Sequence, residues 1–366
     1  MLKQVLEIVE LLDRPEIAAA NIVHLFTRPG IPEVEVQPVR TEKGSTLFIK
    51  LRVPGTHGAT VGGDAPTLGI IGCLGGVRTK PEPIGLVSDA DGCAAALASG
   101  LKLVHMHNVG DRLAGDVIVT THITTDASIV DHVPVPFMTS PVDMVTKNRY
   151  LVDQSMEAVL SLDTTRGNRI INARGFAISP TVKQGYILRV SEDLLTIQQN
   201  VTGRLPAVFA ITTQDITPYG NGVFHLNYIM QPATCTDAPV VGVAITSEIA
   251  VPGSASGASQ ECDIELAARF AVEVAQSFGK GRAKFHDSEE FTRLVTLYGP
   301  MKHLQRAQGS LQSPTDFPDE AKKVEVQPDT ETVRIRQLSA ASRPQSESPQ
   351  VPRMESPGRV GGRVGP

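Results

Sequence analysis

The run TLGIIGCLGG, residues 67–76, decides the predicted fold. It is apolar almost throughout, too short for a helix and bounded by glycine and proline, which favours a strand buried on both faces. Upstream, VEVQPVR (34–40) and STLFIKLRVPG (45–55) alternate apolar and polar residues around the turn EKG and predict a β-hairpin. Apolar residues at helical spacing predict helices over 3–12 and 15–26.

Downstream of this run, helical and strand patterns alternate in the way that an α/β sheet requires. Helices are predicted over 92–107, 142–156, 191–203, 262–279 and 288–299, and strands over 116–124, 158–163, 169–180, 185–190, 206–212 and 240–245. The sequence therefore predicts an α/β fold, a three-layer α/β/α mixed sheet, in a single domain that spans residues 1–305.

Residues 306–366 differ in composition from the rest of the chain. They are rich in Pro, Ser, Gln, Arg and Gly, and we predict a disordered tail because such a segment buries too little apolar surface to offset its ordering entropy. Within the tail, VEVQPDTETVRIR (324–336) alternates apolar and polar residues. A transient strand or docking peptide is therefore an alternative there to a solvated linker.

Composition narrows the class of protein. The 366 residues carry 34 basic and 39 acidic side chains, a formal charge of -5, which excludes a strongly basic nucleic-acid binder. Aromatic residues make up 4% and tryptophan is absent, so base-stacking and sugar-stacking surfaces are disfavoured. No apolar run approaches the roughly 20 residues that cross a bilayer, and acids interrupt the apolar N-terminal stretch. We expect a cytoplasmic protein with a small-molecule or peptide ligand and no nucleic-acid or membrane partner.

Acidic residues follow several of the predicted strands. Asp126 comes after the strand 116–124, Asp163 ends the strand 158–163, and Asp89 and Asp91 precede the helix 92–107. In open α/β sheets, chemistry collects at strand ends because the loops there project side chains into a crevice. For Asp89 and Asp91, helix capping is an equally good interpretation.

The order of these segments resembles the co-catalytic zinc aminopeptidase clan. The resemblance is carried by five stretches in this order: GDAPTLGIIGCLGG, VSDADGCAAALASGLKL, RLAGDVIVTTHITTDA, AVLSLDTT and APVVGVAITSEIAVPGSASGASQECDIELAARF. They are most similar to the deblocking and glutamyl aminopeptidases, and over residues 1–305 the chain is similar to the family called domain of unknown function 1177. The resemblance implies the zinc-aminopeptidase type of α/β fold.

The resemblance also implies a degenerate metal site. In those peptidases two His, two Asp and a Glu-Glu pair hold two zinc ions, and the first Glu is the general base. Here Cys73 stands at the first His, Asp89 at the bridging Asp, Asp163 at the second Asp, and Thr125 with Asp126 at the Glu-Glu pair. No imidazole stands at the last His position, near Gly253 and Ser254.

A divalent metal is the cofactor that these residues suggest. Carboxylates at Asp89, Asp126 and Asp163 with a Cys73 thiolate would suit Mg or Mn better than Zn. His122 shares a strand face with Asp126, and His132 follows in a loop, so both are further candidate ligands. A lone histidine is nonetheless more often a packed or surface residue than a ligand.

Candidate substrate-binding residues lie in TTQDITPYGNGVFHLN, which corresponds to a substrate-side loop of the peptidases. They are Asp215, Asn221 and His225, beside a Gly-rich bend. A turn with Asn221 as a helix cap is the plainer interpretation.

Two functions remain open from the sequence. The first is a metal-dependent, hydrolase-like protein that acts on a small peptide or amide. The second is a catalytically inactive binding or regulatory protein with the peptidase fold, because Thr125 replaces the general base. The β-domain that builds the hollow peptidase assemblies has no room in the sixteen residues between Cys73 and Asp89, so a smaller homo-oligomer or a monomer is expected.

Overall fold

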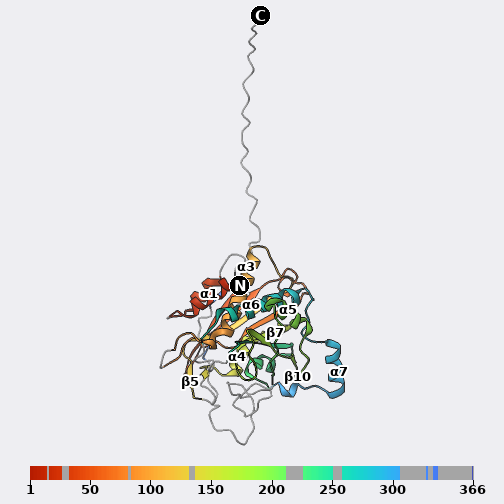
Figure 1. The fold of residues 1–366 in the computed structure, drawn as a ribbon. Coiled ribbons are helices and arrows are strands. Elements are labelled where there is room, and N and C mark those ends of the chain that lie inside the picture. Colours follow the sequence, from red (N-terminus) through yellow and green to blue (C-terminus); the bar gives the residue numbers. More distant parts are fainter. Residues whose placement is uncertain are drawn as a thin grey trace.

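The computed structural model of the protein describes residues 1–14, 16–26, 33–80, 84–131, 137–211, 226–249, 258–305, 327–328, 333–336 and 365. Eleven of the strands in these ranges form one mixed sheet (Figure 1). Its centre is parallel, in the order β11-β7-β3-β4. These four strands are β3 (Leu68–Gly72), β4 (Val117–Thr124), β7 (Ala158–Thr164) and β11 (Val240–Thr246).

The parallel strands are buried along almost their whole length, as expected for strands covered on both faces. From β3 the chain passes first to β4, which pairs with one side of β3. It passes later to β7, which pairs with the other side of β3. The direction of strand order therefore reverses at β3. Such a switch point leaves a crevice outside the carboxyl ends of the flanking strands.

Antiparallel strands complete the two edges of the sheet. On one edge β2 pairs with β4, and β1 pairs with β2 in the predicted hairpin. On the other edge β8 and β9 pair with β11, and β10 pairs with β9. The bounds are β1 (Glu33–Thr41), β2 (Gly44–Val53), β8 (Gly175–Ile178), β9 (Val182–Lys183) and β10 (Tyr186–Ile187). A separate pair joins β5 (Ser128–Val130) and β6 (Phe137–Thr139).

Helices cover both faces of the sheet (Figure 1). One face is covered by α1 (Leu2–Leu12), α3 (Asp91–Asn108), α5 (Glu192–Thr202) and α6 (Glu261–Gly279), with α2 (Ala19–Phe26) over the hairpin. The other face carries α4 (Met144–Leu151) and the 3-10 helix η3 (Tyr228–Thr234). Ile70 and Ile71 of β3 point to opposite cores, which is the period-2 alternation of a strand between two layers.

Helix α3 approaches the sheet closely because its first turn holds glycine. A Cβ atom on Gly92 would lie 2.6 Å from the carbonyl oxygen of Leu162 on β7. The alanine run that follows is buried against the sheet and α6. This close packing fixes the residues just before α3, including the 3-10 turn η2 (Ser88–Ala90), at the carboxyl ends of the strands.

The structure confirms the predicted α/β/α mixed sheet and most of its elements. The predicted Ser191 start of a helix is also confirmed, since its hydroxyl accepts a hydrogen bond from the Leu194 amide. Helix α7 (Ser288–Tyr298) lies where a helix was predicted. The predicted strand over 206–212 is wrong for its described residues, where only Val208 forms an isolated bridge, to Ile178. Pro206 has no amide hydrogen for a ladder at this point.

Part of the predicted tail pairs with the edge of the sheet. Two short strands, β12 (Gln327–Pro328) and β13 (Val333–Arg336), run antiparallel to β1. The register puts Arg336 opposite Glu33 and Arg334 opposite Glu35. For these six residues the docking-strand interpretation holds rather than the solvated linker.

Deleting residues 327–336 is expected to speed amide hydrogen exchange in the first half of β1 by about tenfold or more, because that edge loses its paired strand. Hydrogen-exchange mass spectrometry measures the effect. Deletion of 341–350 removes the same length outside the two strands and serves as the control. Equal exchange of β1 in both proteins would contradict the pairing.

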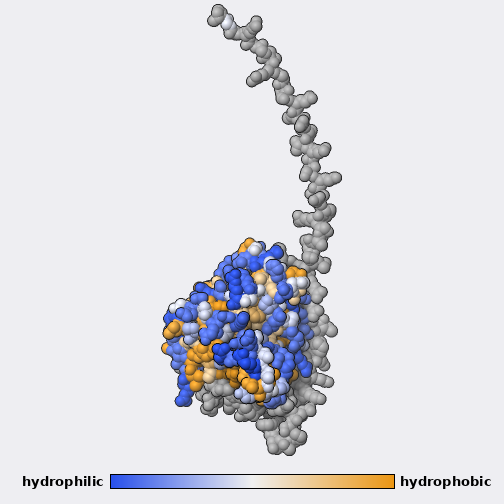
Figure 2. Space-filling view, turned by 90° about the vertical axis from the view of Figure 1, so that its right-hand side faces the viewer, coloured by the Kyte–Doolittle hydropathy of each residue, from blue (hydrophilic) through white to orange (hydrophobic). Residues whose placement is uncertain are grey.

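Hydrophilic residues cover much of the face in Figure 2, with hydrophobic residues between them. Among the described residues, no helix has both the length and the apolar character that a membrane crossing requires.

Candidate functional site

A cleft of about 350 Å³ lies at the switch point, outside the carboxyl ends of β3 and β4. Its lining includes polar side chains from five segments, together with the Gly75–Gly76 turn. We call it the Lys147 cleft and define it by Gly76, Asp89, His122, Asp143, Lys147 and Tyr228. The volume is in the range of small-molecule sites.

Lys147 is the only lysine or arginine among the lining residues that the structure describes for this cleft. It lies on α4, whose first turn is capped by Asp143 through hydrogen bonds from Thr146. Its side chain is 5% exposed and its Nζ donates a 3.0 Å hydrogen bond to the Tyr228 hydroxyl. Burial lowers the pKa of Lys147 to about 8, against the opposing effect of the charges on Asp89 and Asp163.

His122, from β4, contributes a neutral imidazole to the cleft. It is 2% exposed, and burial together with the Lys147 charge holds its pKa well below the ordinary value of 6.5. Its Nδ1 atom is buried and has no hydrogen-bond partner among the described residues. A buried polar atom of this kind costs free energy unless a water or a ligand satisfies it.

Asp89 reaches the cleft from η2, and its position depends on a glycine. The Gly76 amide donates a 3.1 Å hydrogen bond to Asp89 Oδ2. A Cβ atom on Gly76 would lie 2.3 Å from the same oxygen and 2.8 Å from Met138 Sδ. Glycine at position 76 therefore allows the carboxylate to lie against the turn.

We expect Gly76→Ala to lower the free energy of unfolding by about 1–3 kcal/mol, because the new methyl group forces Asp89 or Met138 to move. Denaturant unfolding measures the change. Gly85→Ala is the matched control, since a Cβ there has no atom within 4 Å. Equal stabilities of the two variants would show that the turn accommodates a side chain.

Cys73 directly follows β3 and Asp163 lies near the end of β7, and neither residue lines the cleft. The Cys73 thiol is 2.8 Å from the Ser161 hydroxyl, and burial followed by the Asp163 charge raises its pKa far above the usual range. The thiol is therefore protonated near neutral pH. Asp163 is 3% exposed and accepts a hydrogen bond from the Thr164 amide.

Asp126 has its recorded partners outside the Lys147 cleft. Its carboxylate accepts hydrogen bonds from the Ser45 amide and hydroxyl and forms an ion pair with Lys80. Burial would raise its pKa, but these partners hold it below the ordinary value. Asp126 is thus engaged with the β1–β2 turn, and it does not line the Lys147 cleft.

Four predicted site residues lie outside the described residues. They are the candidate ligand His132 and the candidate substrate-binding residues Asp215, Asn221 and His225. Their roles remain predictions.

Of the six predicted ligands, Asp89 and His122 line the Lys147 cleft, and His132 lies outside the described residues. Among the described residues, no group of three or more His, Cys, Asp and Glu side chains is arranged to hold one. Cys73 is not among the residues that line the cleft. Asp126 is turned to Ser45 and Lys80, and a buried ammonium group is already present in the cleft.

Sequence analysis missed Lys147, Tyr228 and Asp143. One signal was available for Lys147, which lies four residues before Leu151 and therefore on the same helix face. That face is buried. Tyr228 had no local signal, because its hydroxyl meets Lys147 only through the packing of η3 on the sheet.

Asp91 belongs to a different buried cluster. Its carboxylate forms an ion pair with Arg166, whose Nη1 also lies 3.7 Å from Asp263 Oδ2 on α6. Arg166 is 2% exposed and has a φ of 35°, in the left-handed region that non-glycine residues rarely adopt. This cluster ties the end of β7 to the first turns of α3 and α6.

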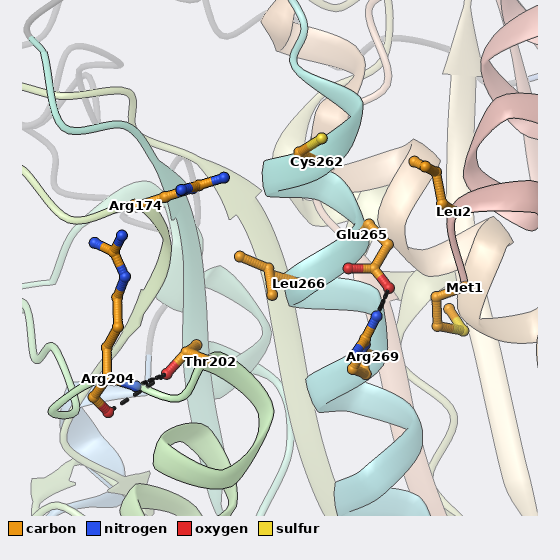
Figure 3. A pocket seen from close by; sticks show the side chains of 9 residues that line it. All are labelled: Met1, Leu2, Arg174, Thr202, Arg204, Cys262, Glu265, Leu266 and Arg269. Atoms are coloured by element: carbon orange, nitrogen blue, oxygen red, sulfur yellow. Dashed lines mark hydrogen bonds and ion pairs between the residues drawn. The ribbon is translucent and has the colours of Figure 1, made fainter.

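A second cavity, of about 640 Å³, lies beside α6 (Figure 3). Three arginines line it, but Arg269 is bonded to Glu265 and Arg204 to Glu248. Both guanidinium groups are about half exposed, so the charge is already compensated and solvated. We therefore assign the candidate functional site to the Lys147 cleft.

The fold and the cleft define an α/β protein whose mixed sheet holds a cleft at its switch point. The chain belongs to the family described as "Protein of unknown function (DUF1177)", whose sequence profile matches residues 37–308, and this confirms the predicted family.

Solved structures with a similar arrangement include two enzymes. One is described as the bottromycin maturation enzyme BotP, with 12% identity, a TM-score of 0.44, and coverage of 76% of this chain and 70% of that one. The other is the leucine aminopeptidase LAP1 of Caenorhabditis elegans, with 10% identity, a TM-score of 0.42, and coverage of 75% and 66%. No curated protein matches the sequence significantly.

Proposed function

We propose that the protein is a hydrolase-like enzyme that acts on a small peptide or amide in the Lys147 cleft. The observation that carries the proposal is the convergence of Asp89, His122, Lys147 and Tyr228, from four separate segments, in one cleft at the switch point. Perturbed titratable groups in a cleft of this kind are typical of functional sites.

The cleft offers complementary groups for amide hydrolysis. The Lys147 ammonium group and the Tyr228 hydroxyl supply hydrogen-bond donors for the oxygen of a carbonyl, where negative charge develops during attack. A water molecule attacks the carbonyl carbon, Asp89 accepts its proton, and the proton passes to the nitrogen as the C–N bond breaks. The products are a carboxylic acid and an amine, and no step passes through a metal ion.

Charge favours a ligand with a free amino group. Among the described lining residues, two carboxylates, Asp89 and Asp143, line the cleft with one ammonium group, that of Lys147. A peptide with a free amino terminus would place a positive charge beside these two carboxylates. Acetylation of the amino terminus removes that positive charge.

The test is a matched panel of dipeptides and amino-acid amides, each with a free or an acetylated amino terminus, incubated with the full chain in EDTA. Mass spectrometry detects products, and we expect turnover of the free compounds that Asp89→Asn abolishes. Lys183→Met is the control, because Lys183 is a partly buried lysine outside the cleft that bonds to the Asp237 carbonyl. The absence of any product across the panel would contradict the enzymatic proposal.

A second candidate is a binding or regulatory protein that uses the same cleft without turnover. Two observations favour it: Thr125 stands where the peptidases have a base, and Asp126 is engaged by Ser45 and Lys80. Calorimetry with the same panel separates the two candidates. Binding that Asp89→Asn weakens, with no product, supports this second function.

A further inference from the structure

Lys147 is a buried lysine that forms no ion pair with a carboxylate in the described part of the chain. Its Nζ atom donates its hydrogen bond to a neutral group, the Tyr228 hydroxyl, and lies 5.7 Å from the centre of the Tyr228 ring. Burying an ammonium group without an ion-pair partner costs free energy, so this environment favours the neutral amine. Burial brings the pKa of Lys147 to about 8, and a share of the amine is therefore free near neutral pH.

The amine also lies at a space that a ligand can enter. Lys147 lines the cleft, whose volume of about 350 Å³ suits a small molecule. His122 lines the same cleft, is 2% exposed, and has an Nδ1 atom without a hydrogen-bond partner among the described residues. A buried polar atom of this kind indicates a site for a water molecule or a ligand. The cleft thus combines a buried amine with a polar group that a ligand would satisfy.

We propose that Lys147 binds carbonyl compounds covalently, with its neutral amine forming an imine with a small, uncharged aldehyde or ketone in the Lys147 cleft. A desolvated lysine amine is a nucleophile toward such compounds. An uncharged ligand fits best, because the carboxylates of Asp89 and Asp143 also line the cleft and would repel an acid. This activity goes beyond the proposed amide hydrolysis and uses the other protonation state of the same lysine.

The reaction needs only proton transfers. Nζ attacks the carbonyl carbon, the N–C bond forms, and one amine proton passes to the oxygen to give a carbinolamine. The second amine proton passes to the new hydroxyl group, the C–O bond breaks, and the nitrogen electron pair forms the C=N bond. Two amine hydrogens and the carbonyl oxygen leave as one water molecule, so no oxidant or reductant takes part. The Tyr228 hydroxyl, 3.0 Å from Nζ, is placed to relay these protons.

The experiment is reductive trapping of the imine on the full wild-type chain near neutral pH. Propanal is added with sodium cyanoborohydride, which reduces an imine to a stable amine, and peptide mass spectrometry gives the rate of modification at each lysine. We expect Lys147 to react about tenfold or more faster than Lys183. Lys183 is the internal control, because it is partly buried, bonds to the Asp237 carbonyl and lies outside the cleft.

Unfolding the chain in guanidinium chloride should abolish the preference for Lys147, since the preference depends on burial in the cleft. Equal rates at Lys147 and Lys183 in the folded chain, or a preference that persists after unfolding, would overturn the proposal. The comparison is made within one wild-type protein, so it does not depend on the folding of a variant.

Two further arms test the proton relay and the class of ligand. Tyr228→Phe should slow trapping at Lys147 by about tenfold or more and leave Lys183 unchanged, and an unchanged Lys147 rate would contradict the relay. With glyoxylate, an anionic aldehyde, the preference for Lys147 over Lys183 should be smaller than with propanal, and a larger one would overturn the uncharged class. No arm uses an amide, so an empty dipeptide panel would contradict the proposed function and leave this assignment intact.

Discussion

Replacing Arg166 by methionine is expected to lower the free energy of unfolding by about 3–5 kcal/mol, the largest stability change that we predict. The guanidinium group is buried with the carboxylates of Asp91 and Asp263, and the variant would leave both without their cation. The left-handed backbone at position 166 would also lose the ion pair that holds it. Urea unfolding followed by circular dichroism measures the loss.

The loss in Arg166→Met should depend on pH. Burial already raises the pKa of Asp91 from 3.8 to about 7, with Arg166 opposing the rise. Without Arg166 the folded-state pKa rises further, while the unfolded value stays near 3.8, so the folded state gains protons relative to the unfolded state as pH falls. The deficit is therefore larger at about pH 8 than at about pH 5.

Arg189→Met is the matched control for Arg166→Met. Arg189 pairs with Glu290 and Asp287 on the surface, where solvent screens the charges. We expect no measurable change in stability for this control. A similar loss in both variants, or a deficit at position 166 that is independent of pH, would be evidence against the buried ion-pair cluster.

The catalytic efficiency of the proposed reaction should fall as pH rises through about 8, because Lys147 then loses the charge that stabilises the carbonyl oxygen. Lys147→Met should reduce kcat/KM by roughly 10²- to 10³-fold at neutral pH, as the loss of an oxyanion donor does. Lys147→Arg keeps its charge at every accessible pH, so the residual activity should lose the alkaline limb. Initial rates across pH with the substrate found in the panel measure both effects.

An opposite slope would assign a different role to Lys147. If the amine acts as a general base, the rate rises as pH passes 8, and Lys147→Arg is inactive throughout. Lys183→Met should keep the wild-type profile, since that lysine lies outside the cleft. The sign of the alkaline limb therefore separates a cation from a base.

The fold followed from local patterns. The run 67–76 and the flanking hairpin were readable because burial on two faces or on one face leaves a distinct apolar spacing. The apolar segment 206–212 was misleading, because Phe209 and Ile211 are buried without joining a ladder, while Val208 is exposed.

The site was less readable because it depends on contacts between distant segments. Asp89 was identified from its place near a strand end and from the resemblance to the aminopeptidases. In the structure it lines the cleft. Asp126 satisfied the same rule, but its direction is set by Ser45, which is 81 residues away in sequence. The bond between Lys147 and Tyr228 also spans 81 positions, and neither residue alone has a motif.

The burial of the thiols makes one position of this protein suited to chemical labelling. Burial raises the pKa of Cys73, Cys93 and Cys235, so little thiolate is available at those sites near neutral pH, whereas Cys262 is exposed at the start of α6. A maleimide dye or nitroxide should therefore attach at Cys262 of the wild-type chain without prior removal of the other cysteines. Such a probe would report on the first turn of α6, beside the Asp263 that pairs with Arg166.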